Sequence, residues 1–298
     1  MADWAAELRV DEPLAERLLA EQFPHLRRLS LALLGEGWDY TAFLVDEAWV
    51  FRFPRRAVVV PGTEREIATL PSLASLLPVA IPKPEHVGRP SDAFPWPFYG
   101  ARHLPGTEPS ASLSDEARTA LARPLARTLR ALHAPAALAT VGHALPFDPI
   151  GRADMAVRVP RTGEAMAAIA DLWQAPPEAE ELFERALELP APEPRAVCHG
   201  DLHFRQLLVR GNALTGIVDW VDLCRSDPGV DLSLAYGFLP SAARREFLDE
   251  YGAVDPASLV RAQMLALNLM AILARYGHDE EMPDVEGEAL AGLERVFA

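Results

Sequence analysis

Two segments determine the fold and the chemistry that the sequence predicts: His199-Gly-Asp-Leu-His-Phe-Arg-Gln-Leu-Leu-Val209 and Gly216-Ile-Val-Asp-Trp220. Their apolar parts, Leu207–Val209 and Leu214–Val218, predict two short strands. The intervening Arg210-Gly-Asn212 is typical of a tight turn. Together these features predict a β-hairpin, which returns the end of its second strand to the start of its first.

The predicted hairpin brings three polar side chains around one small pocket: Asp201, Gln206 and Asp219. Phosphoryl transfer uses such a set, because a carboxylate orients and deprotonates the attacking hydroxyl while oxygen ligands hold Mg²⁺ at the phosphates. The interval from Asp201 to Gln206 equals the D-x-x-x-x-N interval of kinase catalytic loops. Ordinary turn carboxylates are the alternative, but acids flanked by apolar strand residues are costly to place without a function.

Composition restricts the partners and the location that we expect. The chain has 298 residues, half of them hydrophobic, and 43 acidic against 28 basic residues give a net charge of −15. Such a charge repels phosphate backbones and argues against a nucleic-acid partner. The start resembles no signal peptide, and the longest apolar stretch, Met264–Leu273, is too short to cross a bilayer. With only two cysteines, Cys198 and Cys224, the sequence predicts a cytoplasmic protein without a membrane partner.

The first third of the chain predicts a small β-rich part. Alternation of Leu29, Leu31 and Leu33 indicates a strand, and a helix is expected over Pro61–Leu77 with Pro71 interrupting it. Further strands are predicted at Thr41–Val45, Ala48–Phe53, Glu85–Gly88 and Pro97–Leu104.

After Gly106 the pattern becomes helical. Ser114 is a good N-cap for a helix that reaches His133. The acidic run Asp279–Glu288 is typical of a solvated helix face, or would border an acceptor cleft. Further helices are predicted at Arg161–Gln174, Pro177–Leu187, Ala242–Tyr251, Pro256–Tyr276 and Glu286–Phe297. Together with the β-rich first part, these helices give an α+β fold class.

The motifs HGDLHFRQLLV, IVDW and DPGVDLSLAYG resemble those of the aminoglycoside phosphotransferase family, within the wider protein-kinase-like fold. The loop also resembles the macrolide branch of that family. The resemblance spans nearly the whole chain and implies a bilobal α+β fold, with a nucleotide-binding N-lobe at 1–103. The C-lobe at 104–298 would carry the catalytic loop and the acceptor-binding helices. The implied reaction transfers the γ-phosphoryl group of ATP or GTP, with Mg²⁺, to a hydroxyl of a macrolide or an aminoglycoside.

The same resemblance assigns roles within the catalytic loop. Asp201 would be the catalytic base and Asp219 the main Mg²⁺ ligand. Gln206 takes the second metal position, where the family has Asn, and its extra methylene moves the carbonyl outward. His203 stands where protein kinases carry a lysine that touches the γ-phosphate; a loop histidine without that role is the alternative. Arg205 completes the predicted catalytic set.

Three further motif positions are expected to support this loop. His199 is interpreted as a bracing group and not as a catalyst. Asp231 resembles a buried helix-cap aspartate that anchors the loop, and Asp227-Pro228 resembles a supporting turn.

The resemblance also assigns the nucleotide site. Arg52 stands where kinases place the lysine that pairs with phosphates, and arginine keeps the charge. Glu66 is its expected partner and Glu64 the fallback. The segment Tyr99–Leu104 resembles the hinge that reads the purine. The predicted nucleotide-binding residues are Gly35, Gly37, Thr41, Arg52, Glu66, Arg102 and His103.

Several other functions fit parts of the sequence. The triplet His199-x-Asp201-x-His203 resembles a metallohydrolase site, but the other histidines form no second cluster in the sequence. A non-catalytic nucleotide-binding module and a kinase for a metabolic alcohol (choline, homoserine or a ketosamine) remain alternatives. A protein kinase is disfavoured, because no segment ending in Ala-Pro-Glu follows Asp219. The excess of acid favours a small, amine-bearing acceptor, and the protein is expected to be a monomer or a homodimer.

Overall fold

The computed structural model describes residues 6–26, 30–37 and 39–298. The chain divides into two compact units, one of Met1–Ser75 with Ile81–Leu104 and one of Leu76–Ala80 with Pro105–Ala298. The segment that leaves the first unit after Ser75 therefore packs with the second before the chain returns. The assignment of nucleotide binding to 1–103 and of catalysis to 104–298 stays a prediction.

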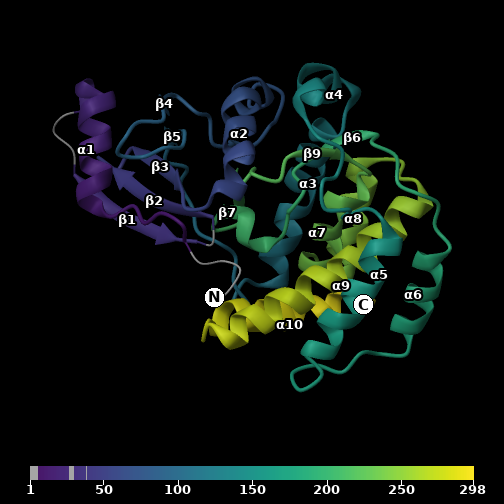
Figure 1. Ribbon diagram of the computed structural model, residues 1–298. Coiled ribbons are helices and arrows are strands. Elements are labelled where there is room, and N and C mark those ends of the chain that lie inside the picture. Colours follow the sequence, from purple (N-terminus) through teal and green to yellow (C-terminus); the bar gives the residue numbers. More distant parts are fainter. Residues whose placement is uncertain (1–5, 27–29, 38) are drawn as a thin grey trace. The chain divides into compact units, whose positions relative to one another are not determined.

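The first unit is built on one antiparallel five-stranded sheet with the order β1-β2-β3-β5-β4 (Figure 1). Alternate residues of its strands, among them Phe43, Phe51 and Phe53, are buried in one apolar core. The predicted strands are confirmed, except that Leu29 lies outside the described residues. The strands are β1 (Leu31–Glu36), β2 (Tyr40–Val45), β3 (Trp49–Pro54), β4 (His86–Gly88) and β5 (Phe98–Arg102).

Two helices complete this unit. α1 (Glu12–Gln22) was not expected from the sequence, although Asp11 caps it by accepting the N–H of Leu14 at 3.0 Å. α2 (Val60–Leu73) carries Pro71 in its last turn and ends before the predicted Leu77. A proline so near the end removes one backbone hydrogen bond without breaking the helix body.

The second unit is mainly helical (Figure 1). Its helices are α3 (Asp115–Leu132), α4 (Pro135–Val141), α5 (Met155–Ala168), α6 (Glu178–Leu187), α7 (Gly229–Phe238), α8 (Ser241–Tyr251), α9 (Pro256–Asp279) and α10 (Pro283–Phe297). α9 has the length and hydropathy of a membrane span, yet 72% of its most apolar window is buried inside the unit. α9 is therefore the core helix against which α7 and α10 pack.

These bounds correct one prediction for the helical part, confirm another and add a helix that was not predicted. The helix expected at Arg161–Gln174 runs instead over Met155–Ala168, because Asp154 caps it and Pro160 is accommodated inside it. α7 was not expected: it is buried all round and so has no amphipathic pattern. Ser114 caps α3 by accepting the N–H of Ala117 at 3.2 Å, as predicted.

The predicted hairpin is present as β7 (Leu207–Arg210) and β8 (Ala213–Ile217). Leu207 lies opposite Ile217, so the residues that flank the hairpin return to each other. A second short pair, β6 (Ala196–Cys198) and β9 (Cys224–Ser226), holds the chain before the loop at 199–206 against the chain after the hairpin.

Candidate functional site

The buried carboxylate of Asp231 anchors the loop at 199–206. Asp231, in the first turn of α7, accepts the backbone N–H groups of His199 at 2.8 Å and Gly200 at 3.0 Å. His133 Nε2 lies 3.1 Å from the same carboxylate. Burial alone would raise the pKa of Asp231, but its contacts with His133 and with the loop hold that pKa below the ordinary value. Asp231 therefore anchors the loop as an ionised group.

His199 ties the loop to the segment after β8. Its Nε2 lies 3.0 Å from the carbonyl oxygen of Val218, and its ring packs on Trp220 with centroids 4.6 Å apart. Its Nδ1 accepts the N–H of Asp201 at 3.4 Å. These contacts agree with the bracing role expected for this histidine.

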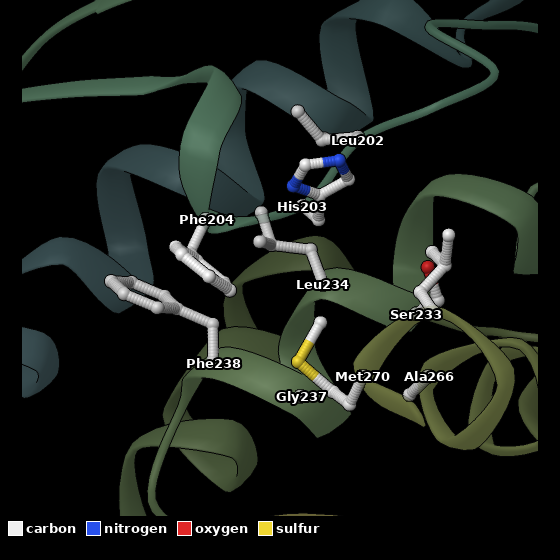
Figure 2. Close-up of a pocket in the computed structure, with 10 residues that line it drawn as sticks. Leu202, His203, Phe204, Ser233, Leu234, Gly237, Phe238, Ala266 and Met270 are labelled. Atoms are coloured by element: carbon white, nitrogen blue, oxygen red, sulfur yellow. The ribbon is translucent and has the colours of Figure 1, made fainter. Parts of the chain in front are cut away.

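Apolar side chains fix the underside of the same loop. Leu202 and Phe204 are buried, and they line an apolar pocket together with α7 residues Leu234 and Phe238 and α9 residue Met270 (Figure 2). Asp201, directly before Leu202, keeps 31% of its side chain exposed. The loop therefore presents one carboxylate on a rigid apolar base.

Three charged or titratable groups surround Asp201. Arg152 Nη2 lies 3.6 Å from Oδ1 of Asp201 and 3.0 Å from Oδ2 of Asp222, and His203 Nε2 lies 3.7 Å from Oδ2 of Asp201. Burial would raise the pKa of Asp201, but His203 and Arg152 outweigh it and hold that pKa below its usual value. Asp201 is therefore an ionised carboxylate, as a proton acceptor must be.

His203 itself is neutral near pH 7. Burial lowers its pKa to about 4, against the opposing charge of Asp201. Its Nδ1 accepts the N–H of Arg205 at 3.4 Å, which leaves the ring proton on Nε2, facing Asp201. The guanidinium of Arg205 points to Glu108 and lies over the ring of Tyr276, so the structure places it with these two residues.

Gln206 and Asp219 are brought to one end of the hairpin. The carbonyl oxygen of Gln206 accepts the N–H of Val218 at 2.9 Å, directly before Asp219, whose φ of +66° turns the chain there. The side-chain Oε1 of Gln206 is buried and has no hydrogen-bond partner among the described residues. A buried amide oxygen without a partner is a ligand type that suits a hard cation such as Mg²⁺, so this residue fits the predicted metal.

The first unit holds the predicted phosphate-pairing arginine in a network of its own. Arg52 Nη1 lies 2.9 Å from Oε1 of Glu66, which is fully buried, and 3.1 Å from the hydroxyl of Tyr99. Its guanidinium lies over the ring of Tyr40 at 4.0 Å. Glu66, and not Glu64, is therefore the partner of Arg52.

The other predicted nucleotide-binding residues lie in or directly after strands β1, β2 and β5 of the same sheet. Gly35 is at an irregularity of β1, and Gly37 donates its N–H to the carbonyl of Tyr40 at 2.9 Å; Trp38 of this loop is outside the described residues. Thr41 is buried in β2. Arg102, at the end of β5, stacks over Trp49, and the N–H of His103 is bonded to the carbonyl of Ala48 at 2.8 Å. Their roles toward a nucleotide stay predictions.

Sequence reasoning missed three residues that contact this site: Arg152, Asp222 and His133. Asp222 lies three residues after Asp219, and this short interval is only a weak signal in the sequence. Arg152 and His133 reach the loop from segments distant in sequence, and no local pattern marks them.

Comparison with known proteins places this fold and site in a family. The model of the phosphotransferase enzyme family matches residues 30–264, whereas curated protein sequences gave no match. The GDP complex of wild-type aminoglycoside 2'-phosphotransferase-IIIa is 24% identical, with a TM-score of 0.69 over 96% of this chain and 98% of that chain. The GDP and kanamycin complex of APH(2")-IIia is also 24% identical, with a TM-score of 0.66 over 95% and 98%. Macrolide 2'-phosphotransferase MphH from Brachybacterium faecium is 23% identical, with a TM-score of 0.57 over 89% and 91%.

These likenesses establish the fold, and the predicted bilobal, kinase-like α+β class is confirmed. The family match covers the sheet of the first unit, the loop at 199–206, the hairpin and the start of α9. On that match, this chain belongs to the phosphotransferase enzyme family.

Proposed function

We propose that this phosphotransferase transfers the γ-phosphoryl group of ATP or GTP to a hydroxyl of a small, antibiotic-like acceptor. The observation that carries the proposal is Asp201, an ionised and partly exposed carboxylate on a loop anchored by Asp231 and packed on apolar side chains. A base must be held rigidly within reach of the hydroxyl that it deprotonates. The family membership supplies the reaction class, transfer of a phosphoryl group to an alcohol.

In this proposal Asp201 orients the acceptor hydroxyl and takes its proton as the oxygen attacks the γ-phosphorus. Cationic Arg152 keeps the carboxylate ionised, and neutral His203 faces it with Nε2 at 3.7 Å. Gln206 and Asp219 would hold Mg²⁺, which neutralises charge on the phosphates when bound. Arg52, fixed by Glu66, would pair with the nucleotide phosphates.

The donor and the acceptor are supported by different kinds of evidence. Similar solved structures carry GDP, and one carries ATP, which supports a nucleoside triphosphate without choosing between them. One similar structure carries kanamycin and another is a macrolide phosphotransferase. The acidic composition favours an acceptor with an amine. A metabolic alcohol remains the second candidate, because the described loop contacts favour no one acceptor.

The proposal is tested by acceptor-dependent release of ADP or GDP from a panel of macrolides, aminoglycosides and metabolic alcohols. Asp201→Asn removes the base but keeps the shape of the side chain, so turnover should fall by roughly 10²–10⁴. Nucleotide affinity, measured by calorimetry, should change little in this variant. Full turnover by Asp201→Asn on an identified acceptor would exclude Asp201 as the base.

A further inference from the structure

We propose that Arg152 is a positioning residue that joins the proposed base to the chain segment carrying the proposed metal ligand; this inference rests on the proposed function. Arg152 Nη2 is shared between Asp201, on the loop at 199–206, and Asp222, three residues after Asp219. One guanidinium thus spans two chain segments that must keep a fixed separation during phosphoryl transfer. Planar guanidinium groups suit such bridging of carboxylates.

The two segments touch at the backbone as well. Gly200 has a φ of +93°, and a Cβ added to it would lie 2.3 Å from the carbonyl oxygen of Asp222. The loop can approach the segment after the hairpin this closely only because position 200 has no side chain. The loop at 199–206 and the segment of Asp222 are therefore joined twice, by the backbone at Gly200 and by the side chain of Arg152.

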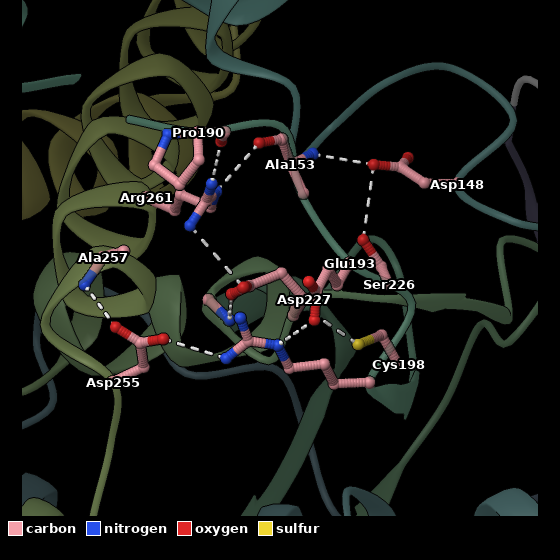
Figure 3. Close-up of polar contacts among 12 residues, drawn as sticks. Asp148, Ala153, Pro190, Glu193, Cys198, Ser226, Asp227, Asp255, Ala257 and Arg261 are labelled. Carbon is pink, nitrogen blue, oxygen red and sulfur yellow. Dashed lines mark hydrogen bonds and ion pairs between the residues drawn. The ribbon is translucent and has the colours of Figure 1, made fainter. Parts of the chain in front are cut away.

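Arg152 is itself held by a turn that the side chain of Asp148 stabilises. Asp148 accepts the N–H of Arg152 at 2.8 Å. Figure 3 shows two further contacts of Asp148: it accepts the N–H of Ala153 at 2.7 Å and the hydroxyl of Ser226 of β9 at 3.3 Å. Backbone bonding of Asp148 to Arg225 fixes the same turn to β9. The guanidinium therefore projects from a rigid support, as a positioning role requires.

The guanidinium of Arg152 is also a positive charge beside Asp201 at neutral pH. Burial lowers the pKa of His203 to about 4, so its ring is uncharged at neutral pH. Arg152 is nine-tenths buried, and its Nη1 has no hydrogen-bond partner among the described residues. A guanidinium that served packing alone would be expected to satisfy its N–H groups. The groups that face Asp201 are His199, His203, Arg152, Asp222 and, farther away, Arg158.

The test replaces Arg152 by Gln and by Lys and measures the pKa of the Asp201 carboxyl directly. In carbon-13 NMR of the ligand-free protein, with Asp201→Asn assigning the signal, Arg152→Gln should raise the pKa of the Asp201 carboxyl. Arg152→Lys keeps a charge and should leave that pKa near its wild-type value. Arg225→Gln is the matched control: Arg225 lies on the adjoining β9 and donates to Leu145, so its loss should not move the Asp201 titration.

Kinetics on the acceptor found in the screen supply the second readout. Arg152→Gln should lower kcat by roughly 10²-fold with little change in the KM for nucleotide, and should move the acidic limb of the pH profile upward. Arg152→Lys should return the acidic limb of the pH profile to its wild-type position but should recover only part of kcat, because an ammonium group cannot bridge both carboxylates. Asp222→Asn removes one anchor and should lower kcat in the same direction, which tests the idea even if Arg152→Gln fails to fold.

A folded Arg152→Gln with wild-type titration of Asp201 and wild-type kcat would overturn the inference. So would a fall in kcat that only follows the loss of folded protein. If the wild type releases no diphosphate with any acceptor, the proposed function fails instead, and the NMR titration still decides whether Arg152 acts on Asp201.

Discussion

His203 combines a buried ring with a large shift in protonation. Burial, together with the positive charge of Arg205, lowers its pKa to about 4, although Asp201 opposes the shift. In the unfolded chain a histidine titrates near pH ~6.5. Between these values the unfolded state binds a proton that the folded state does not.

Stability should therefore fall as the pH is lowered from about 6.5 toward 4, with His203 contributing a loss of roughly 3 kcal/mol by pH 4. His203→Asn should remove this part of the loss. Urea unfolding of both proteins at pH 7.5 and 5 measures it, and this range excludes Asp201 and Asp231, whose lowered pKa values make them lose stability only at more acidic pH. An equal loss in both proteins would show that His203 is not protonated on unfolding.

Gln206 offers a second prediction for a single residue. If its buried Oε1 is a metal ligand, Gln206→Asn should keep a donor oxygen and be tolerated, whereas Gln206→Leu should raise the Mg²⁺ concentration needed for half-maximal turnover. The measurement is a Mg²⁺ titration of turnover for the three proteins. Superimposable titrations of wild type and Gln206→Leu would place position 206 outside the metal site.

At the scale of elements, the loop at 199–206 depends on the conformation of one glycine. Gly200 has a left-handed φ and leaves no room for a Cβ against Asp222. Gly211, in the turn of the β7–β8 hairpin, also has a positive φ of +57°, but nothing lies within 4 Å of its added Cβ. The two glycines thus share a positive φ, which would strain any replacement, and they differ in packing.

Gly200→Ala should separate the loop from Asp222 and lower turnover by roughly 10²-fold, with a stability loss of roughly 1–3 kcal/mol. Gly211→Ala should cost about 1 kcal/mol of stability and leave turnover unchanged. Thermal unfolding and turnover of both variants provide the comparison. Equal turnover in the two variants would mean that the close approach at Gly200 does not position the base.

At the scale of the whole molecule, the net charge of −15 shapes the choice of acceptor. A bulky apolar ring with one amine gains most of its affinity from buried area, at about 25 cal/mol per Å². A polycationic aminoglycoside would depend on several exposed carboxylates, whose attraction salt screens over roughly 8–10 Å.

We predict a macrolide-like acceptor whose apparent KM changes by less than roughly threefold between about 0.05 and 0.5 M salt. Initial rates at several salt concentrations measure this, with neutral alcohols as the control for effects on the nucleotide. Turnover of an aminoglycoside with a steep salt dependence, and of no macrolide, would reverse the choice of acceptor.

One of the acidic residues in this excess forms a buried ion pair. Glu288 belongs to the acidic run that is typical of a solvated face, yet it is fully buried in α10 and lies 2.6 Å from Arg118 of α3. Arg295 also reaches it, at 2.9 Å. Composition shows how much acid a chain has, and only packing shows which carboxylate is enclosed.

The sequence by itself determined the hairpin, the interval from Asp201 to Gln206 and the return to Asp219, because these depend on local strand and turn preferences. It also indicated the α3 cap, which depends on one side chain and its own helix. It missed α7 because a helix buried on every side shows no periodicity.

The groups around Asp201, the proposed base, depend on the tertiary structure alone. Arg152, Asp222 and His133 reach the loop at 199–206 through space, and each contact depends on how separate elements pack. Nearby charges lower the pKa of Asp201 against its burial, whereas burial lowers the pKa of His203, and no interval in the sequence encodes either effect. Local preferences therefore set the catalytic motif, and the packing of distant segments sets its electrostatics.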